Sequence, residues 1–139
     1  MTSLTRRYPF SASHRLHSDR LSAEENARLF GKCNNPYGHG HNYCLEVTVA
    51  GEIDPRTGMV ISPRALDAYV DRMVLAHVDH ANLNADLPEF GAAVPTTENL
   101  GLEIERWLRR DWPSLTATGR LARIRLEETG SNTIEMEFP

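Results

Sequence analysis

The fold of this chain is decided by residues 38–53, which read GHGHNYCLEVTVAGEI. After the two histidines, apolar and polar side chains alternate, and one face would carry the apolar set Tyr43, Leu45, Val47 and Val49. A side-chain period of two is typical of a β-strand with one buried face. We therefore predict a strand from Asn42 to Ile53, with His39 and His41 at its opening.

Further strands are predicted on both sides of this stretch. Apolar residues at even positions predict a strand from Leu4 to Leu16, with His14 on its inner face. Downstream, the turn at 54–58 places Pro and Gly where a tight turn needs them, and Met59–Ile61 is expected to return as a hairpin partner. Two alternating runs near the C-terminus predict two more strands, Leu121–Glu128 and Thr133–Phe138.

Two longer segments have the three- and four-residue apolar spacing of amphipathic helices. The first begins after Ser62-Pro63, a typical N-cap followed by proline at the first helical position, and ends near Val78. The second begins at Thr96 or Thr97 and carries its apolar stripe to Trp112. A shorter helix is expected from Ser22 to Phe30, because Ser22 and Glu25 fit a capping box.

The order of these elements is β-hairpin, two helices, β-hairpin, which predicts an α+β fold in a single domain over residues 1–139. We expect a four-stranded antiparallel sheet with two helices on one face. The other face would then be uncovered and apolar, and it must meet either solvent or another subunit. Oligomerisation is the expected solution.

Composition excludes several classes of function. With 40% hydrophobic and 24% charged residues, the chain can bury a core. Its 15 basic and 19 acidic residues give a net charge of −4 without a basic stripe, which argues against a nucleic-acid partner. No apolar run is long enough to span a membrane, and the N-terminus lacks a signal sequence. Two cysteines are too few for a disulfide scaffold, so we expect a cytoplasmic protein.

Three histidines form the candidate metal site. Residues two apart on a strand project to the same side, so His39 and His41 can present two imidazoles to one ion. His14 lies on the inner face of the first strand, which should neighbour the second. The three imidazoles would leave a fourth position open, as catalytic zinc sites do. The alternatives are that His14 is a core histidine bonded to backbone and that the pair is an exposed strand end.

Two roles remain open for Cys33, which stands six residues before His39. It would either be a fourth zinc ligand in a closed structural site or a thiolate base beside an open one, and spacing does not decide between them. Cys44 is interpreted as a small buried hydrophobic residue inside its strand. His17 falls off the parity of His14 and is expected to start the following loop.

Four further polar residues are candidates outside the histidine group. Asp79 and His80 follow the first long helix and could form part of a proton relay, although the helix dipole alone favours a histidine there. Glu98 stands in the first turn of the second helix, where a capping role would explain it. Glu128 ends an inward-facing strand row, and a partly buried carboxylate needs a donor-rich partner such as the edge of a guanidine-like ring.

These motifs together resemble the 6-pyruvoyl-tetrahydropterin synthase family along nearly the whole chain. The resemblance rests on the segments 10–16 (FSASHRL), 31–36 (GKCNNP), 38–43 (GHGHNY), 51–55 (GEIDP), 78–80 (VDH), 96–99 (TTEN) and 127–129 (EET). It implies the tunnelling fold, in which subunits with a four-stranded sheet and two helices form trimers that close into a barrel, and trimers pair into a homohexamer.

The resemblance also implies roles for individual residues. His14, His39 and His41 would be the ligands of Zn²⁺, and Cys33 would be the general base. Asp79 and His80 would be its proton-relay partners, supplied across a subunit interface. Glu128 would anchor the pterin ring, with help from Thr97 and Glu98.

The implied activity is that of a lyase, a carbon–oxygen lyase acting on phosphates in tetrahydrobiopterin biosynthesis. It would convert 7,8-dihydroneopterin triphosphate to 6-pyruvoyl-tetrahydropterin with loss of triphosphate. One alternative is 6-carboxy-tetrahydropterin synthase of the deazapurine pathway, which takes the same substrate and releases acetaldehyde. In that subfamily we expect a shorter spacing between the cysteine and the His-x-His pair than the five residues between Cys33 and His39. A second alternative is a non-catalytic oligomer stabilised by zinc.

Overall fold

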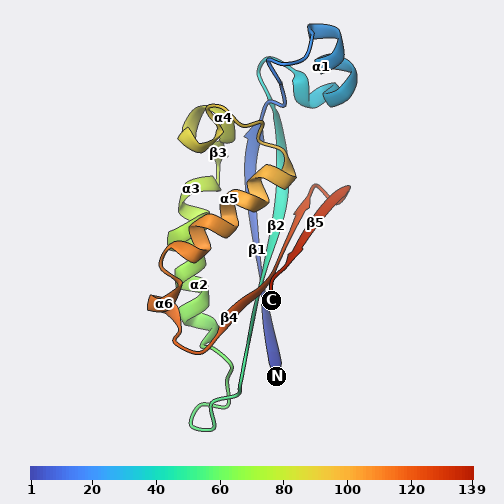
Figure 1. Ribbon diagram of the computed structural model, residues 1–139. Coiled ribbons are helices and arrows are strands. Elements are labelled where there is room, and N and C mark those ends of the chain that lie inside the picture. Colours follow the sequence, from blue (N-terminus) through green and yellow to red (C-terminus); the bar gives the residue numbers. More distant parts are fainter.

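The computed structural model covers residues 1–139 and contains one sheet with its long helices packed on one face (Figure 1). The strand order is β3-β1-β2-β4-β5. The strands are β1 (Thr2–His14), β2 (His39–Gly51), β3 (Ala81–Asn82), β4 (Arg120–Glu128) and β5 (Asn132–Glu137). The four long strands are antiparallel to their neighbours, as predicted. The predicted α+β class is therefore correct, and the strand boundaries differ from the expected ones by a few residues.

The predicted strand count and the expected hairpin partner of β2 are wrong. The short β3 adds a fifth strand and pairs in parallel with Ala12 and Ser13 of β1, so the sheet is mixed. Met59–Ile61 does not form a strand, and only an isolated bridge joins Asp54 to Met59. The reason is that β1 and β4 already occupy the two edges of β2, which leaves no free edge for a hairpin partner.

The helices begin where the sequence predicts. α2 (Pro63–Val70) has Ser62 as its N-cap and continues through the π-helical turn η2 (Asp71–Leu75) into α3 (Ala76–Val78). α5 (Thr97–Arg110) is capped by Thr96. The remaining short helices are α1 (Ala23–Phe30), η1 (Gly31–Asn34), α4 (Leu83–Asp86), η3 (Pro88–Phe90) and α6 (Trp112–Leu115). None of these helices is both long and apolar enough to cross a membrane.

The core lies between the sheet and the two helical segments α2–α3 and α5. Alternate residues of the strands enter it from one face, and the helices contribute their apolar stripes from the other side. Fully buried members include Leu45, Val47, Leu66, Leu100, Ile104 and Ile124. This packing makes the helix-covered face of the sheet rigid, and residues on that face near the strand ends are held at defined positions.

The opposite face of the sheet is uncovered, as expected, but it is polar rather than apolar. Glu46 is 8% exposed there and accepts a 2.8 Å hydrogen bond from Arg125. Arg7 and Arg123 also lie within 4 Å of this carboxylate. Cys44 lies on this face, half-buried, with an Arg7 Nη2 donor 3.5 Å from its sulfur, so our interpretation of Cys44 as a core residue is wrong. Alternation along β2 is therefore between an apolar face and an ion-paired one.

Candidate active site

The strand register gathers the histidines at one end of the helix-covered face. His14 is the direct cross-strand partner of His39, and Ala12 is the partner of His41. Directly opposite residues of an antiparallel pair project to the same face, so all three imidazoles stand on the side that the helices cover. Glu128 joins them, because it pairs with Tyr43 on the next strand. One end of the sheet thus collects residues from β1, β2 and β4.

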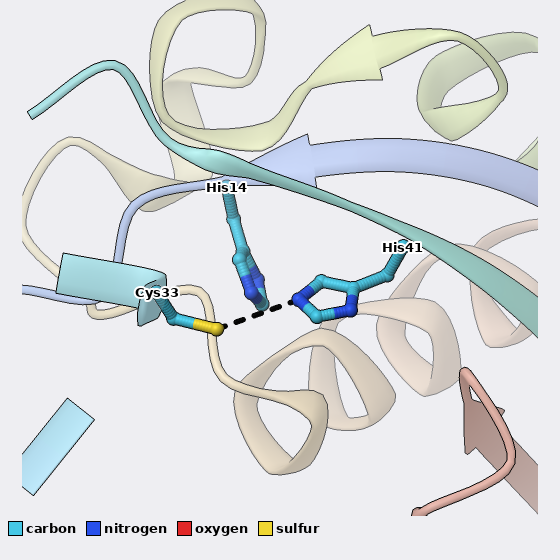
Figure 2. A group of neighbouring side chains, drawn as sticks. All are labelled: His14, Cys33 and His41. Atoms are coloured by element: carbon cyan, nitrogen blue, oxygen red, sulfur yellow. Dashed lines mark hydrogen bonds between the residues drawn. The ribbon is translucent and has the colours of Figure 1, made fainter. Parts of the chain in front are cut away.

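Cys33 completes a compact group with two of the histidines. Figure 2 shows His14, Cys33 and His41 converging from the end of β1, from η1 and from the start of β2. One ligand atom from each residue lies within 4.8 Å of the other two, and Cys33 Sγ is 3.5 Å from His41 Nε2. This group could hold a metal ion.

The hydrogen bonding of His14 leaves one nitrogen without a partner. Its Nδ1 lies 2.9 Å from the carbonyl oxygen of Pro95, which can only accept, so the proton is on Nδ1. Nε2 therefore carries a lone pair, and this buried atom has no hydrogen-bond partner. A histidine that donates one N–H to a backbone carbonyl and offers its other nitrogen is typical of metal ligands. An unpaired buried acceptor is otherwise costly.

His41 and His39 continue the group toward solvent. His41 Nδ1 is 3.0 Å from Thr129 Oγ1, while His41 Nε2 faces both Cys33 and His39 Nδ1, the latter at 3.4 Å. The His39 residue is exposed, in contrast to the fully buried His14. The compact three-atom cluster therefore contains His14, Cys33 and His41, and the third predicted histidine lies at its margin.

Burial sets the protonation of this group in the absence of a cation. It lowers the pKa of His14 and of His41, so both imidazoles are neutral near pH 7 and can offer lone pairs. Burial, with a further contribution from the negative charge of Glu128, raises the pKa of the Cys33 thiol. A cation bound beside Cys33 would act in the opposite direction and favour the thiolate.

Glu128 is a buried carboxylate held by hydroxyl groups. It is 7% exposed, and its Oε2 accepts a 2.6 Å hydrogen bond from Thr97 and a 3.5 Å one from Tyr43. Its Oε1 is 3.9 Å from His41 Nε2. Thr97 reaches it from the first turn of α5, so the sequence-predicted pair of Thr97 and Glu128 is brought together beside the histidines. Glu98, the next residue, is exposed.

Asp79 and His80 do not reach Cys33 within one chain. They follow α3 at the edge of β1, where Asp79 Oδ1 accepts a hydrogen bond of 3.1 Å from the Ser11 backbone N–H. His80 Nδ1 lies 3.2 Å from the same carboxylate oxygen, and the His80 side chain is exposed with a φ of 61°. Together with Ser11, Ser13, Asn42 and Thr129, His80 lines an open pocket. The side chain of His80 is therefore largely exposed and that of Asp79 partly exposed.

Three residues that contact the site histidines were not predicted from the sequence. Pro95 supplies a carbonyl, Thr129 supplies a hydroxyl, and Tyr43 places its phenol oxygen 3.4 Å from His14 Nδ1. Of these three, only Tyr43 could have been found from the sequence, because its even spacing from His39 and His41 places it on their face of the strand. From the sequence it is interpreted as a core residue instead. Its ring does stack on Phe10, with centroids 4.9 Å apart. The predicted loop position of His17 is correct, since it follows the end of β1.

The family model for 6-pyruvoyl tetrahydropterin synthase matches residues 3–138. The chain is similar to 6-pyruvoyl tetrahydrobiopterin synthase of Homo sapiens, with 48% identity over 94% of this chain and 88% of that protein. It is 44% identical to the Drosophila melanogaster protein of the same name, over 98% of this chain and 79% of that one. A solved structure of the Caenorhabditis elegans 6-pyruvoyl tetrahydropterin synthase superposes with a TM-score of 0.87 at 38% identity, covering 99% of this chain and 96% of that one.

These similarities extend over the whole sheet, both long helices and the segment that carries Cys33. The chain belongs to the 6-pyruvoyl tetrahydropterin synthase family and is a lyase-type enzyme of pterin synthesis.

Proposed function

We propose that this protein converts 7,8-dihydroneopterin triphosphate to 6-pyruvoyl-tetrahydropterin with loss of triphosphate. The observation that carries the proposal is the convergence at one sheet end of an unpartnered imidazole nitrogen, a thiol and a buried carboxylate, from His14, Cys33 and Glu128. The His14 nitrogen can hold a cation, the Cys33 thiol can transfer protons, and the Glu128 carboxylate can bind the substrate ring. Membership of the family supports the same reaction.

In this proposal His14, His39 and His41 hold a zinc ion. Imidazole suits zinc, and the Nδ1-protonated form of His14 presents the nitrogen that a ligand needs. Bound zinc would supply a Lewis acid that polarises the side-chain oxygens of the substrate and acidifies the adjacent C–H bonds. The Pro95 carbonyl and the Thr129 hydroxyl would keep His14 and His41 in orientation.

Cys33 is proposed as the general base rather than as a fourth ligand. It lies on η1, outside the sheet that carries the histidines, and its sulfur is 3.5 Å from His41 Nε2. A thiolate in this place would take the proton from C1′ of the side chain and return it at ring carbon C6, so that C1′ becomes a carbonyl while the C6=N5 bond of the ring is reduced. Loss of the C2′ proton then breaks the C3′–O bond, triphosphate leaves with the electron pair, and the resulting enol becomes the second carbonyl and a methyl group. Each oxidation is balanced by a reduction within the same molecule, so no external redox partner is needed.

Asp79 and His80 are proposed to relay protons for the Cys33 of a neighbouring copy. Support comes from their outward-facing position at the edge of β1, away from the Cys33 of their own chain. The outer edges of β5 and of the part of β1 before its pairing with β3 would allow copies to join their sheets into a barrel, and we propose a homohexamer built from two trimers. We place the enzyme in the cytosol, where its two free cysteines stay reduced.

Glu128, Thr97 and Glu98 are proposed to hold the pterin ring. The ring edge offers adjacent N–H donors, and a carboxylate fixed at Oε2 by Thr97 can accept from them as a charge-assisted pair. The distance of 3.9 Å between Glu128 Oε1 and His41 Nε2 supports a ring position next to the proposed metal ligands. The substrate side chain would then lie against zinc and Cys33.

The test is turnover of dihydroneopterin triphosphate, with the product identified by mass spectrometry and triphosphate release measured in parallel. We expect 6-pyruvoyl-tetrahydropterin; release of acetaldehyde would instead identify the 6-carboxy activity, and absence of any turnover would leave a zinc-stabilised oligomer. The five-residue spacing between Cys33 and His39 favours the first outcome.

Two cysteine variants test the role of Cys33. Cys33→Ala should keep about one zinc per chain, because three histidines remain, and should lose roughly 10²–10⁴-fold in kcat. Cys44→Ala is the matched control, since this second free thiol lies on the opposite face of the sheet and should leave kcat unchanged. Loss of zinc and stability in Cys33→Ala would show that Cys33 is a structural ligand and would contradict the base assignment.

A further inference from the structure

The turn that carries Cys33 does not belong to the buried hydrophobic core. It belongs to the excursion of residues 15–38 between β1 and β2, whose helix α1 stands beyond the end of the sheet (Figure 1). The only buried residue of α1 is the polar Asn26, and η1 buries none of its residues. Since hydrophobic burial does not fix this turn, hydrogen bonds have to set the position of Cys33.

Two hydrogen bonds join the turn to Leu16, just after β1. The backbone N–H of Leu16 donates to the carbonyl of Cys33 at 2.7 Å, and the side-chain amide of Asn34 donates to the carbonyl of Leu16 at 2.8 Å. Both polar groups of the Leu16 backbone are therefore used, as they would be opposite a neighbouring strand. The Leu16 carbonyl, which would accept from a backbone N–H in a sheet, here accepts from the side-chain amide of Asn34.

Asn34 also contacts the residues on either side of Leu16. Its backbone carbonyl accepts a 3.2 Å hydrogen bond from Arg15 Nε, and its amide nitrogen lies 3.3 Å from His17 Nδ1. The other nitrogen of His17 lies 3.2 Å from Asp19, which can accept its proton and leave Nδ1 free to accept from Asn34. One residue thus binds three consecutive residues of the segment that leaves His14.

We propose that Asn34 is the positioning residue of Cys33: its side-chain amide ties the Cys33 turn to the segment that follows His14 and thereby holds Cys33 Sγ beside the His14 and His41 nitrogens. The inference rests on the proposed function, in which Cys33 is the base. Proton transfer needs heavy atoms within about 2.6–3.2 Å of each other. A displacement of about 1 Å can cost on the order of 10²-fold in rate, so a loosened turn would slow catalysis without removing any reacting group.

The test compares Asn34→Asp with Asn84→Asp. Asn34→Asp keeps the size of the side chain but replaces its amide donor by an oxygen that would face the Leu16 carbonyl. Asn84, in α4, binds the same exit segment from another side, accepting from the Arg15 N–H at 2.7 Å and donating to the Arg15 carbonyl at 3.0 Å. It does not bind the Cys33 turn, so it is a matched control.

We expect kcat of Asn34→Asp to fall roughly 10- to 100-fold, with KM and zinc content unchanged. Asn84→Asp should keep kcat within about twofold of the unmodified enzyme. Asn34→Ala, which adds no charge, should lose kcat in the same way and replaces Asn34→Asp if that variant does not fold. Equal kcat in the Asn34 and Asn84 variants would overturn the proposal, and so would a parallel loss of zinc, which would mean that Asn34 supports His14 instead.

Alkylation of Cys33 by iodoacetamide gives a readout that does not depend on turnover. Peptide mass spectrometry separates Cys33 from Cys44, so the rate at each thiol can be followed in the zinc-loaded protein. We expect faster alkylation of Cys33 in the Asn34 variants and an unchanged rate in Asn84→Asp. An unchanged rate in all variants would refute the positioning role. An unmodified enzyme without turnover would contradict the proposed function alone, since the alkylation rates would still test the positioning of Cys33.

Discussion

Replacing Thr97 by valine removes the shortest hydrogen bond that Glu128 receives. Valine has nearly the shape of threonine, so the change deletes the 2.6 Å bond to Glu128 Oε2 without opening a cavity. The two residues are only 4% and 7% exposed, so water replaces the lost donor poorly. A bond to a charged group contributes about 1.5–3 kcal/mol to the free energy of unfolding. The remaining donor to this oxygen, Tyr43, is 3.5 Å away.

Thr48→Val is the matched control for this change. Thr48 is 7% exposed, and its hydroxyl bonds to the neutral hydroxyl of Thr5 at 2.7 Å. A neutral pair contributes about 0.5–1.5 kcal/mol. Since 1 kcal/mol moves the melting temperature of a domain of this size by roughly 4 °C, we expect losses of about 6–12 °C for Thr97→Val and about 2–6 °C for Thr48→Val.

The assay combines thermal unfolding at one protein concentration with equilibrium binding of a non-reacting pterin. Thr97→Val should weaken pterin binding, and Thr48→Val should not. In a Glu128→Gln background the cost of Thr97→Val should shrink, because its partner is no longer charged. Equal destabilisation by the two valine substitutions, together with unchanged pterin affinity, would refute the view that Thr97 holds Glu128 in place for the ring.

Two other predictions concern residues that support the site. Gly38 has a φ of +82° and an added Cβ would lie 3.0 Å from the His14 carbonyl oxygen, whereas Gly58 has a φ of +75° with no atom within 4 Å. Gly38→Ala should therefore lower the melting temperature and zinc content more than Gly58→Ala, which adds only backbone strain of about 1–2 kcal/mol; equal effects would contradict the close approach. The hydrogen bond from Arg6 lowers the pKa of Asp67 below its value in the unfolded chain. The ionised carboxylate therefore stabilises the folded state above the unfolded-state pKa of about 4, and this contribution is lost as the pH falls through the lowered pKa of the folded state. Asp67→Asn should flatten the acid branch of the melting temperature against pH, and an unchanged acid branch would show that the ion pair contributes nothing.

Local patterns were enough to predict most of the elements. Alternation predicts the long strands, and the N-caps at Ser62 and Thr96 and the capping box at Ser22 predict where helices begin, because these signals depend on residues a few positions apart. The same period of two places His39 and His41 on one face. The prediction of a hairpin strand at Met59–Ile61 is wrong, because the turn residues report only local conformation. Both edges of β2 are occupied by strands that are distant in the sequence.

The site itself depends on distances that no local pattern contains. The sequence by itself determined which face of each strand is apolar and which histidines share a side. Only the tertiary structure decided that Pro95 orients His14, that Thr97 holds Glu128 and that Asn34 ties Cys33 to Leu16. The physical reason is that side-chain periodicity reports burial within one element, whereas each of these hydrogen bonds joins residues from separate elements, and their approach is set by strand register and helix packing together.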